Sequence, residues 1–247
     1  MVSDILTVLW KELRELPVAA GGGFRGGKGG MLIFLLVFGV YMPLQSGPGW
    51  VTSPLSLLYW AWVPFLLVSS VIADSFAGER ERHTLETLLA SRLSDKAILF
   101  GKLGAGIVYG WGITIACLLL GLVALNLVHG KDGLLLYSPA VGGGILALTF
   151  LVAALASGLG VLISLRAATV RQAQQTFSFA FLLVFVPIFA LPLLPEAWRV
   201  RFSSAVMNVE TNLTPLVLVA GCVLLLLDGI LIAASLVRFQ RSKLILD

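Results

Sequence analysis

The sequence predicts an all-α polytopic membrane protein with six transmembrane helices. Of its 247 residues, 58% are hydrophobic and 12% are charged, and the mean hydropathy is +0.99. Soluble domains are closer to about half apolar and about a quarter charged, so this composition is typical of a chain that lies mostly in lipid. Six apolar runs, separated by short polar segments, can cross a hydrocarbon layer that is roughly 30 Å thick. They leave no room for a second globular domain, so residues 1–247 are expected to form a single transmembrane domain.

The chain begins with an amphipathic pattern over residues 2–16. Charged residues occupy one side of this pattern, and apolar residues recur at helical spacing on the other, namely Ile5, Leu6, Leu9, Trp10, Leu13 and Leu16. This pattern predicts an interfacial helix that lies along the membrane surface. A plain cytosolic extension is the alternative.

A glycine-rich segment follows over residues 21–30, and it contains a spacing found in nucleotide-binding proteins. Gly22, Gly27 and Lys28 match G-x-x-x-x-G-K. A phosphate-binding loop also needs a Ser or Thr directly after the Lys and a strand before the loop, whereas Gly29 follows Lys28 and a predicted span comes next. We therefore expect no cofactor in this chain, and ATP, if it is used, is hydrolysed by another chain.

The apolar runs place the predicted spans in order. The spans cover about residues 31–45, 55–77, 97–128, 139–165, 176–194 and 215–237. Pro64 is expected to kink the second span, and Gly106 and Gly110 in the third span are spaced for close helix contact. Residues 195–214 form a polar segment between the last two spans.

The positive charges predict the orientation of these spans. Lys and Arg gather on one side of the predicted membrane, and only Lys131, Arg199 and Arg201 fall on the other side. Because cytoplasmic loops carry the excess of Lys and Arg, both termini and the segment 78–96 are predicted to be cytoplasmic. This distribution accounts for the net charge of +4, so the charge does not indicate nucleic-acid binding.

Residues 78–96 are the longest strongly polar helical pattern in the chain. The four charged residues at 79–82 precede Leu85, Leu88, Leu89 and Leu93, whose spacing places them on one face of a helix. A short amphipathic helix between two spans, with leucines and charges, is typical of a surface that binds a partner protein. A solvated charged loop is the alternative.

The same segment carries a recognisable motif. From Glu79 to Ser91 the chain reads ERERHTLETLLAS, and this run is followed by Leu93-Ser94 and Gly101-Lys102. It resembles the signature of ABC-2 type transporter permeases, which typically reads E-x-E-x-G-T-L-E-x-L-L-x-x-P-L-S with a Gly-Lys a few residues on. Two positions depart from that signature, His83 where glycine is common and Arg92 where proline is common.

The resemblance implies a non-catalytic permease subunit of an ABC exporter in a prokaryotic cytoplasmic membrane. Such a subunit works as a dimer with a second permease copy or a paralogue. Two cytosolic ABC ATPase subunits bind ATP and Mg and drive it. Residues 195–214 would correspond to extracellular re-entrant helices, and residues 78–96 to a cytoplasmic coupling helix between spans two and three that docks into the ATPase. The residues expected to dock are Glu79, Arg80, Glu81, Arg82, Thr84, Leu85, Glu86, Leu88, Leu89 and Leu93.

Four polar residues in or near the spans are candidates for the transport pathway or its gate. Asp228 lies near the middle of the sixth span, where an ionised carboxylate costs about 3 kcal/mol on insertion scales, so it either bonds to another helix or serves transport. Asp74, near the cytoplasmic end of the second span, could instead reach water or pair with an arginine of the 79–82 run. Gln172 and Gln175 lie at the cytoplasmic entry of the fifth span, where solvation at the interface is the simpler alternative.

Two other classes of protein remain alternatives. A self-contained secondary transporter or channel would use Asp228 as a proton or ion site and would need no ATPase. An intramembrane enzyme would need a set such as His with carboxylates, or a Ser–Lys pair at matching depth. The sequence offers no such catalytic set and no metal-ligand spacing.

Overall fold

The computed structural model describes residues 1–19, 27–53, 56–130, 133–189, 195–196 and 213–239, and every regular element within them is helical. The predicted all-α class is therefore confirmed over the described part of the chain. The elements are α1 (Val2–Ala19), α2 (Gly27–Leu36), the π-helix η2 (Val37–Tyr41), α3 (Met42–Ser46), α4 (Gly49–Thr52), α5 (Ser56–Ala61), α6 (Val63–Glu81), α7 (Leu85–Leu89), α8 (Asp95–His129), α9 (Pro139–Arg166), α10 (Val170–Phe189) and α12 (Leu213–Arg238).

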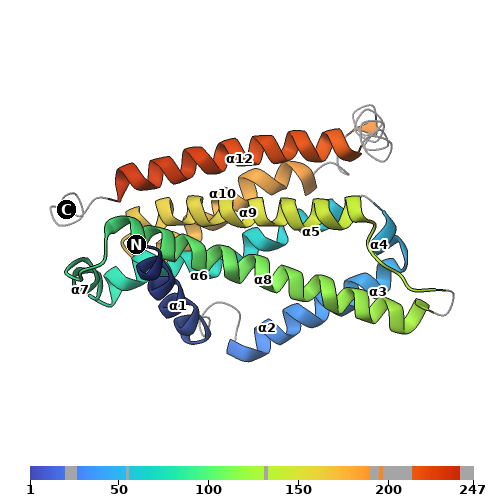
Figure 1. The fold of residues 1–247 in the computed structure, drawn as a ribbon, viewed down its shortest axis with the longest axis horizontal. Helices are drawn as coiled ribbons and strands as arrows, with labels where there is room; N and C mark the ends of the chain where they lie inside the picture. The colour runs from blue at the N-terminus through green and yellow to red at the C-terminus, as the bar shows by residue number, and fades with distance from the viewer. Residues whose placement is uncertain (20–26, 54–55, 131–132, 190–194, 197–212, 240–247) are drawn as a thin grey trace.

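Helices α6, α8 and α9 pack against one another and form the centre of the bundle. Helix α12 packs against α9, α10 against α6 and α9, and the α2–η2–α3 rod against α8. Figure 1 shows α12 and α2 at opposite edges, while α1 crosses one end of the bundle close to α7. The segments predicted to be cytoplasmic therefore gather at one end of the molecule.

Five described helical stretches are long and apolar enough to cross a membrane. They are Gly29–Ser46, Tyr59–Glu81, Asp95–His129, Pro139–Arg166 and Val217–Arg238, which correspond to the predicted spans one, two, three, four and six. The predicted fifth span, about 176–194, is not among them. Helix α10 covers only part of it, because residues 190–194 lie outside the described residues.

The directions of α9 and α12 are consistent with the predicted fifth span, about residues 176–194. Gly144 of α9 faces Val217 of α12, and Gly158 faces Leu231, so α9 and α12 run in the same direction. The chain between them must return along the bundle, and α10 begins that return (Figure 1). The six-span arrangement stays a prediction. Of the predicted extracellular segment 195–214, residues 197–212 lie outside the described residues.

Two prolines set the irregularities of the first two spans. The N–H of Met42 donates to Val37 O across the π-helix, directly before Pro43, which has no N–H to continue an α-helical pattern. Helix α5 ends at Ala61, and α6 begins at Val63 with Pro64 in its first turn, where the missing N–H has no cost. The kink predicted at Pro64 is thus present as a break between two helices.

Glycines let the central helices approach closely. A Cβ at Gly106 would lie 2.6 Å from Ser157 Oγ, and one at Gly110 would lie 2.5 Å from Val68 Cγ2, which confirms the close contact predicted from their spacing. The tightest contact joins α9 and α6, where a Cβ at Gly160 would lie 1.8 Å from Ile72 Cγ2. Since Ile72 is fully buried and β-branched, it cannot move aside easily.

Helix α1 confirms the predicted amphipathic helix and extends it to Ala19. Val8 is buried against α8, where Gly101 allows the two helices to touch, whereas Leu6 and Trp10 are exposed. The exposed apolar side is free to contact a membrane surface.

The structure divides the predicted coupling helix 78–96 into several parts. Helix α6 continues to Glu81, α7 covers only Leu85–Leu89, and α8 begins at Asp95 after Ser94, whose hydroxyl accepts a hydrogen bond from Ala97 N–H. The reason is His83, whose φ of 56° lies in the left-handed region and cannot continue a right-handed helix. Glycine adopts this φ without steric cost, which explains its preference at this position of the motif.

We predict that Gly160→Ala lowers the free energy of unfolding by about 1–3 kcal/mol, because the added methyl group overpacks the contact between α9 and α6. Gly143→Ala on the same helix is the matched control, since nothing lies within 4 Å of a Cβ there. Thermal unfolding of the two variants in detergent checks this. Equal midpoints would contradict the close contact.

The left-handed turn gives a second prediction. His83→Val should destabilise the chain by about 1–2 kcal/mol, because a β-branched residue tolerates a positive φ poorly. His83→Gly should be at least as stable as the wild type. If denaturant titrations rank the two variants in the opposite order, the turn at His83 is not left-handed.

Candidate functional site

The four consecutive charged residues at the end of α6 contact four different parts of the chain. Glu79 pairs with Lys102 of α8 at 3.0 Å. Arg80 donates to the carbonyl oxygens of two residues at the end of α9, Leu165 and Ala167. Glu81 Oε2 accepts from Val170 N–H at the start of α10. Arg82 pairs with Asp74, two turns earlier in α6. The 79–82 run therefore joins α6 to α8, α9 and α10.

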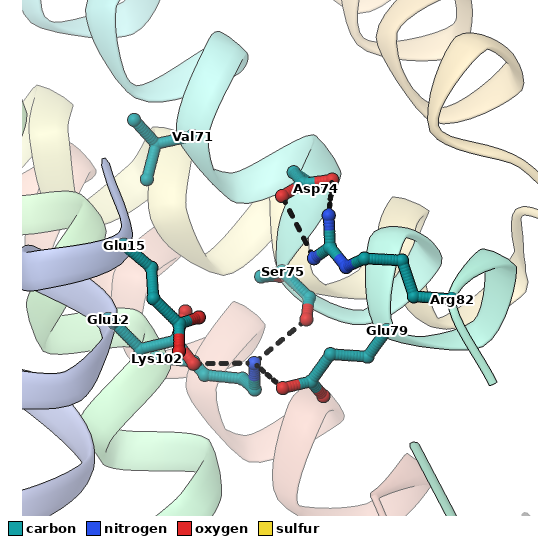
Figure 2. Close-up of a pocket in the computed structure, with 8 residues that line it drawn as sticks. All are labelled: Glu12, Glu15, Val71, Asp74, Ser75, Glu79, Arg82 and Lys102. Atoms are coloured by element: carbon teal, nitrogen blue, oxygen red, sulfur yellow. Dashed lines mark hydrogen bonds and ion pairs between the residues drawn. The ribbon is translucent and has the colours of Figure 1, made fainter. Parts of the chain in front are cut away.

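The most buried of these contacts is centred on the ammonium group of Lys102, whose side chain is 1% exposed. Its Nζ lies 2.8 Å from Glu12 Oε1, 2.8 Å from Ser75 O and 3.0 Å from Glu79 Oε1 (Figure 2). The ammonium group thus donates two hydrogen bonds, to Glu12 and to Ser75 O, and forms an ion pair with Glu79. The same nitrogen lies 5.0 Å from the centre of the Phe76 ring, within the range of a cation–π contact.

Helix α1 reaches this cluster through two further residues. Lys11 Nζ lies 3.4 Å from Glu79 Oε1 and 3.8 Å from Glu15 Oε1. Partial burial lowers the pKa of Lys11, but the carboxylates of Glu79, Glu12 and Glu15 outweigh burial and raise it above 10.5. A raised lysine pKa means that the charged form stabilises the fold below pH 10.5 and that this contribution is lost at higher pH. We call Lys102, Glu79, Glu12 and Lys11 the polar junction.

The polar junction fixes three helices by charge rather than by packing alone. Removing two or more charged groups from water is costly, and this cost is offset only where geometry is good and the donors are used. Glu79, with 7% of its side chain exposed, contributes one oxygen to both lysines, and its Oε2 has no hydrogen-bond partner in the described part of the chain. A cavity of about 20 Å³ beside these residues is large enough for one water molecule.

Three described leucines of the motif, Leu85, Leu88 and Leu93, pack against the protein's own core. Leu85 is buried, and Leu88 and Leu93 are half-buried against the same core. Leu89 lies in α7, but its side chain is outside the described part. The exposed side of residues 84–87 is polar instead. Thr84 and Glu86 on this side are among the residues expected to dock to the ATPase. Within this chain, Leu85 contacts the chain's own core and Glu79 is held by Lys102. Docking of an ATPase at residues 79–93 stays a prediction.

Comparison with known proteins decides the family. The family model described as ABC-2 family transporter protein matches residues 45–207, which is more than half of the chain and includes the whole 78–102 region. The chain belongs to the ABC-2 transporter family. No curated protein and no solved structure matches it. It is thus a membrane component of a transporter, and its polar junction lies at the family motif.

In this ABC-2 family member, Asp74 forms the ion pair that was one of its predicted alternatives. Both oxygens of Asp74 accept from the guanidinium group of Arg82, at 3.3 and 3.2 Å. The pair passes over Gly78, where a Cβ would lie 2.0 Å from Asp74 Oδ1. Asp74 therefore stabilises the C-terminal end of α6.

The two glutamines predicted at a gate lie at the start of α10. Gln172 accepts from Ala168 N–H through its side chain, and its own N–H donates to Thr169 Oγ1. This reciprocal arrangement resembles a capping box and stabilises the first turn of the helix. Gln175 is exposed one turn later. The structure thus gives Gln172 a structural role.

Asp228 is the pathway candidate that packing does not explain. It is 6% exposed on α12, and neither carboxylate oxygen has a hydrogen-bond partner among the described residues. Its neighbours in sequence, Leu226, Leu227 and Ile230, are exposed and apolar. An acidic group in such surroundings is a candidate for function.

Sequence reasoning missed three residues of this site. Lys102 entered only as part of the Gly-Lys pair in the motif, although its position inside a span already marked it as a costly charge. Glu12 was counted only as the polar side of an interfacial helix. Ser164 gave no sequence signal, yet its buried hydroxyl accepts from the N–H groups of Phe76 and Ala77 and donates to Ala73 O.

We predict that Lys102→Met lowers the free energy of unfolding by about 3–5 kcal/mol, because it removes the buried cation from Glu79 and Glu12 and leaves only the partly exposed Lys11 beside them. Lys96→Met, at an exposed position in the first turns of the same helix, removes an equal charge and should have little effect. Thermal unfolding of both variants in detergent is the measurement. If the two variants melt together, the junction does not stabilise the fold.

Proposed function

We propose that this ABC-2 family member is the permease subunit of an ABC exporter and that separate ATPase subunits drive it. Membership in the family supports the role in transport. The phosphate-binding motif at Gly22, Gly27 and Lys28 lacks the Ser or Thr that should follow the Lys, which supports ATP and Mg binding by a partner chain. The permease acts as a dimer, with a second copy of this chain or a paralogue, and binds two ATPase subunits.

The single observation that carries this proposal is the set of contacts made by residues 79–82. Through Glu79, Arg80 and Glu81, the turn that precedes α7 is joined to α8, to the end of α9 and to the start of α10. Glu79 also joins it to α1 through Lys11. A partner that displaces this turn therefore displaces the cytoplasmic ends of five helices together.

In the proposed mechanism, ATP binding closes the two ATPase subunits on each other and moves the docked residues 83–93. The movement passes through the polar junction into the spans, and the two permease copies rock between inward and outward access. Docking must persist in both states of the ATPase so that its movement reaches the permease. The contacts must also differ in free energy between the two states, because a partner without such a difference cannot shift the equilibrium. The resemblance favours export, a prokaryotic cytoplasmic membrane and cytoplasmic termini.

Burial indicates which side chains meet the ATPase. Thr84, Glu86 and Thr87 are exposed on the outward side of the turn and of α7. The inward leucines hold α7 on its own bundle, so that a force applied to α7 is passed on rather than absorbed. We therefore assign docking to the polar side of α7, and assign transmission to its leucine side.

This assignment predicts that Glu86→Arg with Thr87→Arg separates the permease from its ATPase without unfolding it. Permease purified from native membranes should lose the ABC ATPase that mass spectrometry identifies with the wild type, while its unfolding midpoint stays unchanged. Glu196→Arg, an exposed charge reversal on the predicted extracellular side, is the matched control. Retention of the ATPase by the double variant would contradict docking at α7.

A second function is favoured by Asp228, a buried acid whose oxygens have no partner in the described part of the chain. In this alternative the chain is a self-contained secondary transporter or channel, and Asp228 binds a proton or an ion. Purified chain in vesicles with an ion gradient and no ATP distinguishes the two functions. The permease proposal predicts no transport there, whereas transport that Asp228→Asn abolishes would establish the alternative.

A further inference from the structure

A groove of about 420 Å³ opens where α9, α10 and α12 meet at the end of the bundle that carries α1 and α7. This volume lies within the range of roughly 300–1,000 Å³ that is usual for small-molecule sites. The residues of the polar junction do not line the groove, and of the residues in the 79–82 contacts Ala167 alone is among its lining residues. Its walls come from the last turns of α9 and α12 and the first turns of α10.

The lining of the groove changes from apolar to basic along its length. Leu159 and Leu162 line it on α9, and Ala234 lines it on α12. Arg166 and Arg238 lie at the ends of the same two helices. Leu159 precedes Arg166 by seven residues, which is about 10 Å along a helix. The groove thus has an apolar half and a cationic half.

Both arginines are available to a ligand. They are exposed, and no carboxylate in the described part of the chain lies within ion-pair distance of either one. Thr176 of α10 adds a hydroxyl group to the lining. Guanidinium groups bind phosphate through charge-assisted and often bidentate hydrogen bonds.

The position of the groove indicates which class of ligand binds there. Its apolar half is formed by residues of Pro139–Arg166 and Val217–Arg238, two helical stretches that are long and apolar enough to cross a membrane. The outward side of α12 beside it is apolar and exposed, including Ile230 and Val237, so the groove is continuous with a surface suited to lipid. A ligand with one phosphate and a hydrocarbon tail matches both halves.

We propose that this groove binds an acidic phospholipid of the membrane. The two guanidinium groups of Arg166 and Arg238 bind its phosphate, and an acyl chain lies along Leu159, Leu162 and Ala234. Because α9, α10 and α12 all contribute, a bound lipid holds these three helix ends together next to Ala167, whose carbonyl oxygen accepts from Arg80. This binding site is independent of the proposed ATPase partner.

The test uses the purified full-length chain in detergent with added phosphatidylglycerol, and with phosphatidylcholine of the same acyl chains for comparison. Native mass spectrometry measures bound lipid, and thermal unfolding measures its effect. Wild type should retain phosphatidylglycerol preferentially and melt at a higher temperature with it. Arg166→Gln with Arg238→Gln should weaken the apparent affinity about 30-fold, given roughly a fivefold loss for each basic residue near a lipid surface.

Two further variants test whether lipid binding depends on the groove itself or on positive charge anywhere on the protein. Arg92→Gln with Lys96→Gln removes the same charge from an exposed loop and the helix that follows, and should bind phosphatidylglycerol as the wild type does. Ala234→Phe keeps both arginines, fills the apolar half and should weaken binding. Soluble glycerol 3-phosphate tests the head group alone and should give no stabilisation.

Several results would overturn the proposal. One is equal binding of the two lipids by wild type. Another is an equal loss of phosphatidylglycerol binding in the Arg166 and Arg238 variant and in the Arg92 and Lys96 variant. Protection by glycerol 3-phosphate as strong as that by phosphatidylglycerol would indicate a soluble anion site. Unchanged lipid binding together with loss of the ATPase in the Arg166 and Arg238 variant would make the groove a protein contact.

Discussion

The arrangement of the end of the bundle that carries α1 and α7 depends on one buried ammonium group, that of Lys102. A lysine at this depth is unfavourable unless every N–H is used and opposite charge is close. Glu12 of α1, and Glu79 and a main-chain oxygen of α6, meet that demand for a lysine of α8. The ammonium group therefore fixes the positions of α1, α6 and α8 relative to one another.

The two ends of the bundle are held by different kinds of interaction. At the junction end, charged side chains and the buried hydroxyl of Ser164 bind main-chain groups of neighbouring helices. At the opposite end the core is largely apolar and aromatic, with Trp50 packed against Tyr59 and Trp60. Directional bonds fix helix ends in position, whereas apolar contacts allow side chains to repack. The junction end is thus held by directional bonds between helices, and the opposite end by apolar and aromatic packing.

The sequence predicted the features that depend on local pattern. Hydropathy located the five stretches that the structure provides as candidate spans, and Pro64 marked a real break in the second. The spacing of Leu85 and Leu88 identified one helix face, but spacing does not reveal what covers that face, and the cover is the protein's own core. The partners of Lys102 lie 90 and 23 residues away in the chain, so no local pattern could assign them. His83 stands out in the motif because glycine is common there, and the structure explains this by a positive φ.

The central claim is that residues 83–93 move with α1 and the spans as one unit when the ATPase acts. Distance measurements between spin labels at exposed Leu6 and Arg92 test it directly, in a chain whose two cysteines are replaced and which is diluted with unlabelled copies. The account predicts the same narrow Leu6–Arg92 distance in nucleotide-free and ATP-bound complexes, while the distance between the Arg92 labels of two copies changes. A Leu6–Arg92 distance that shifts on ATP binding, with the distance between copies unchanged, would contradict it.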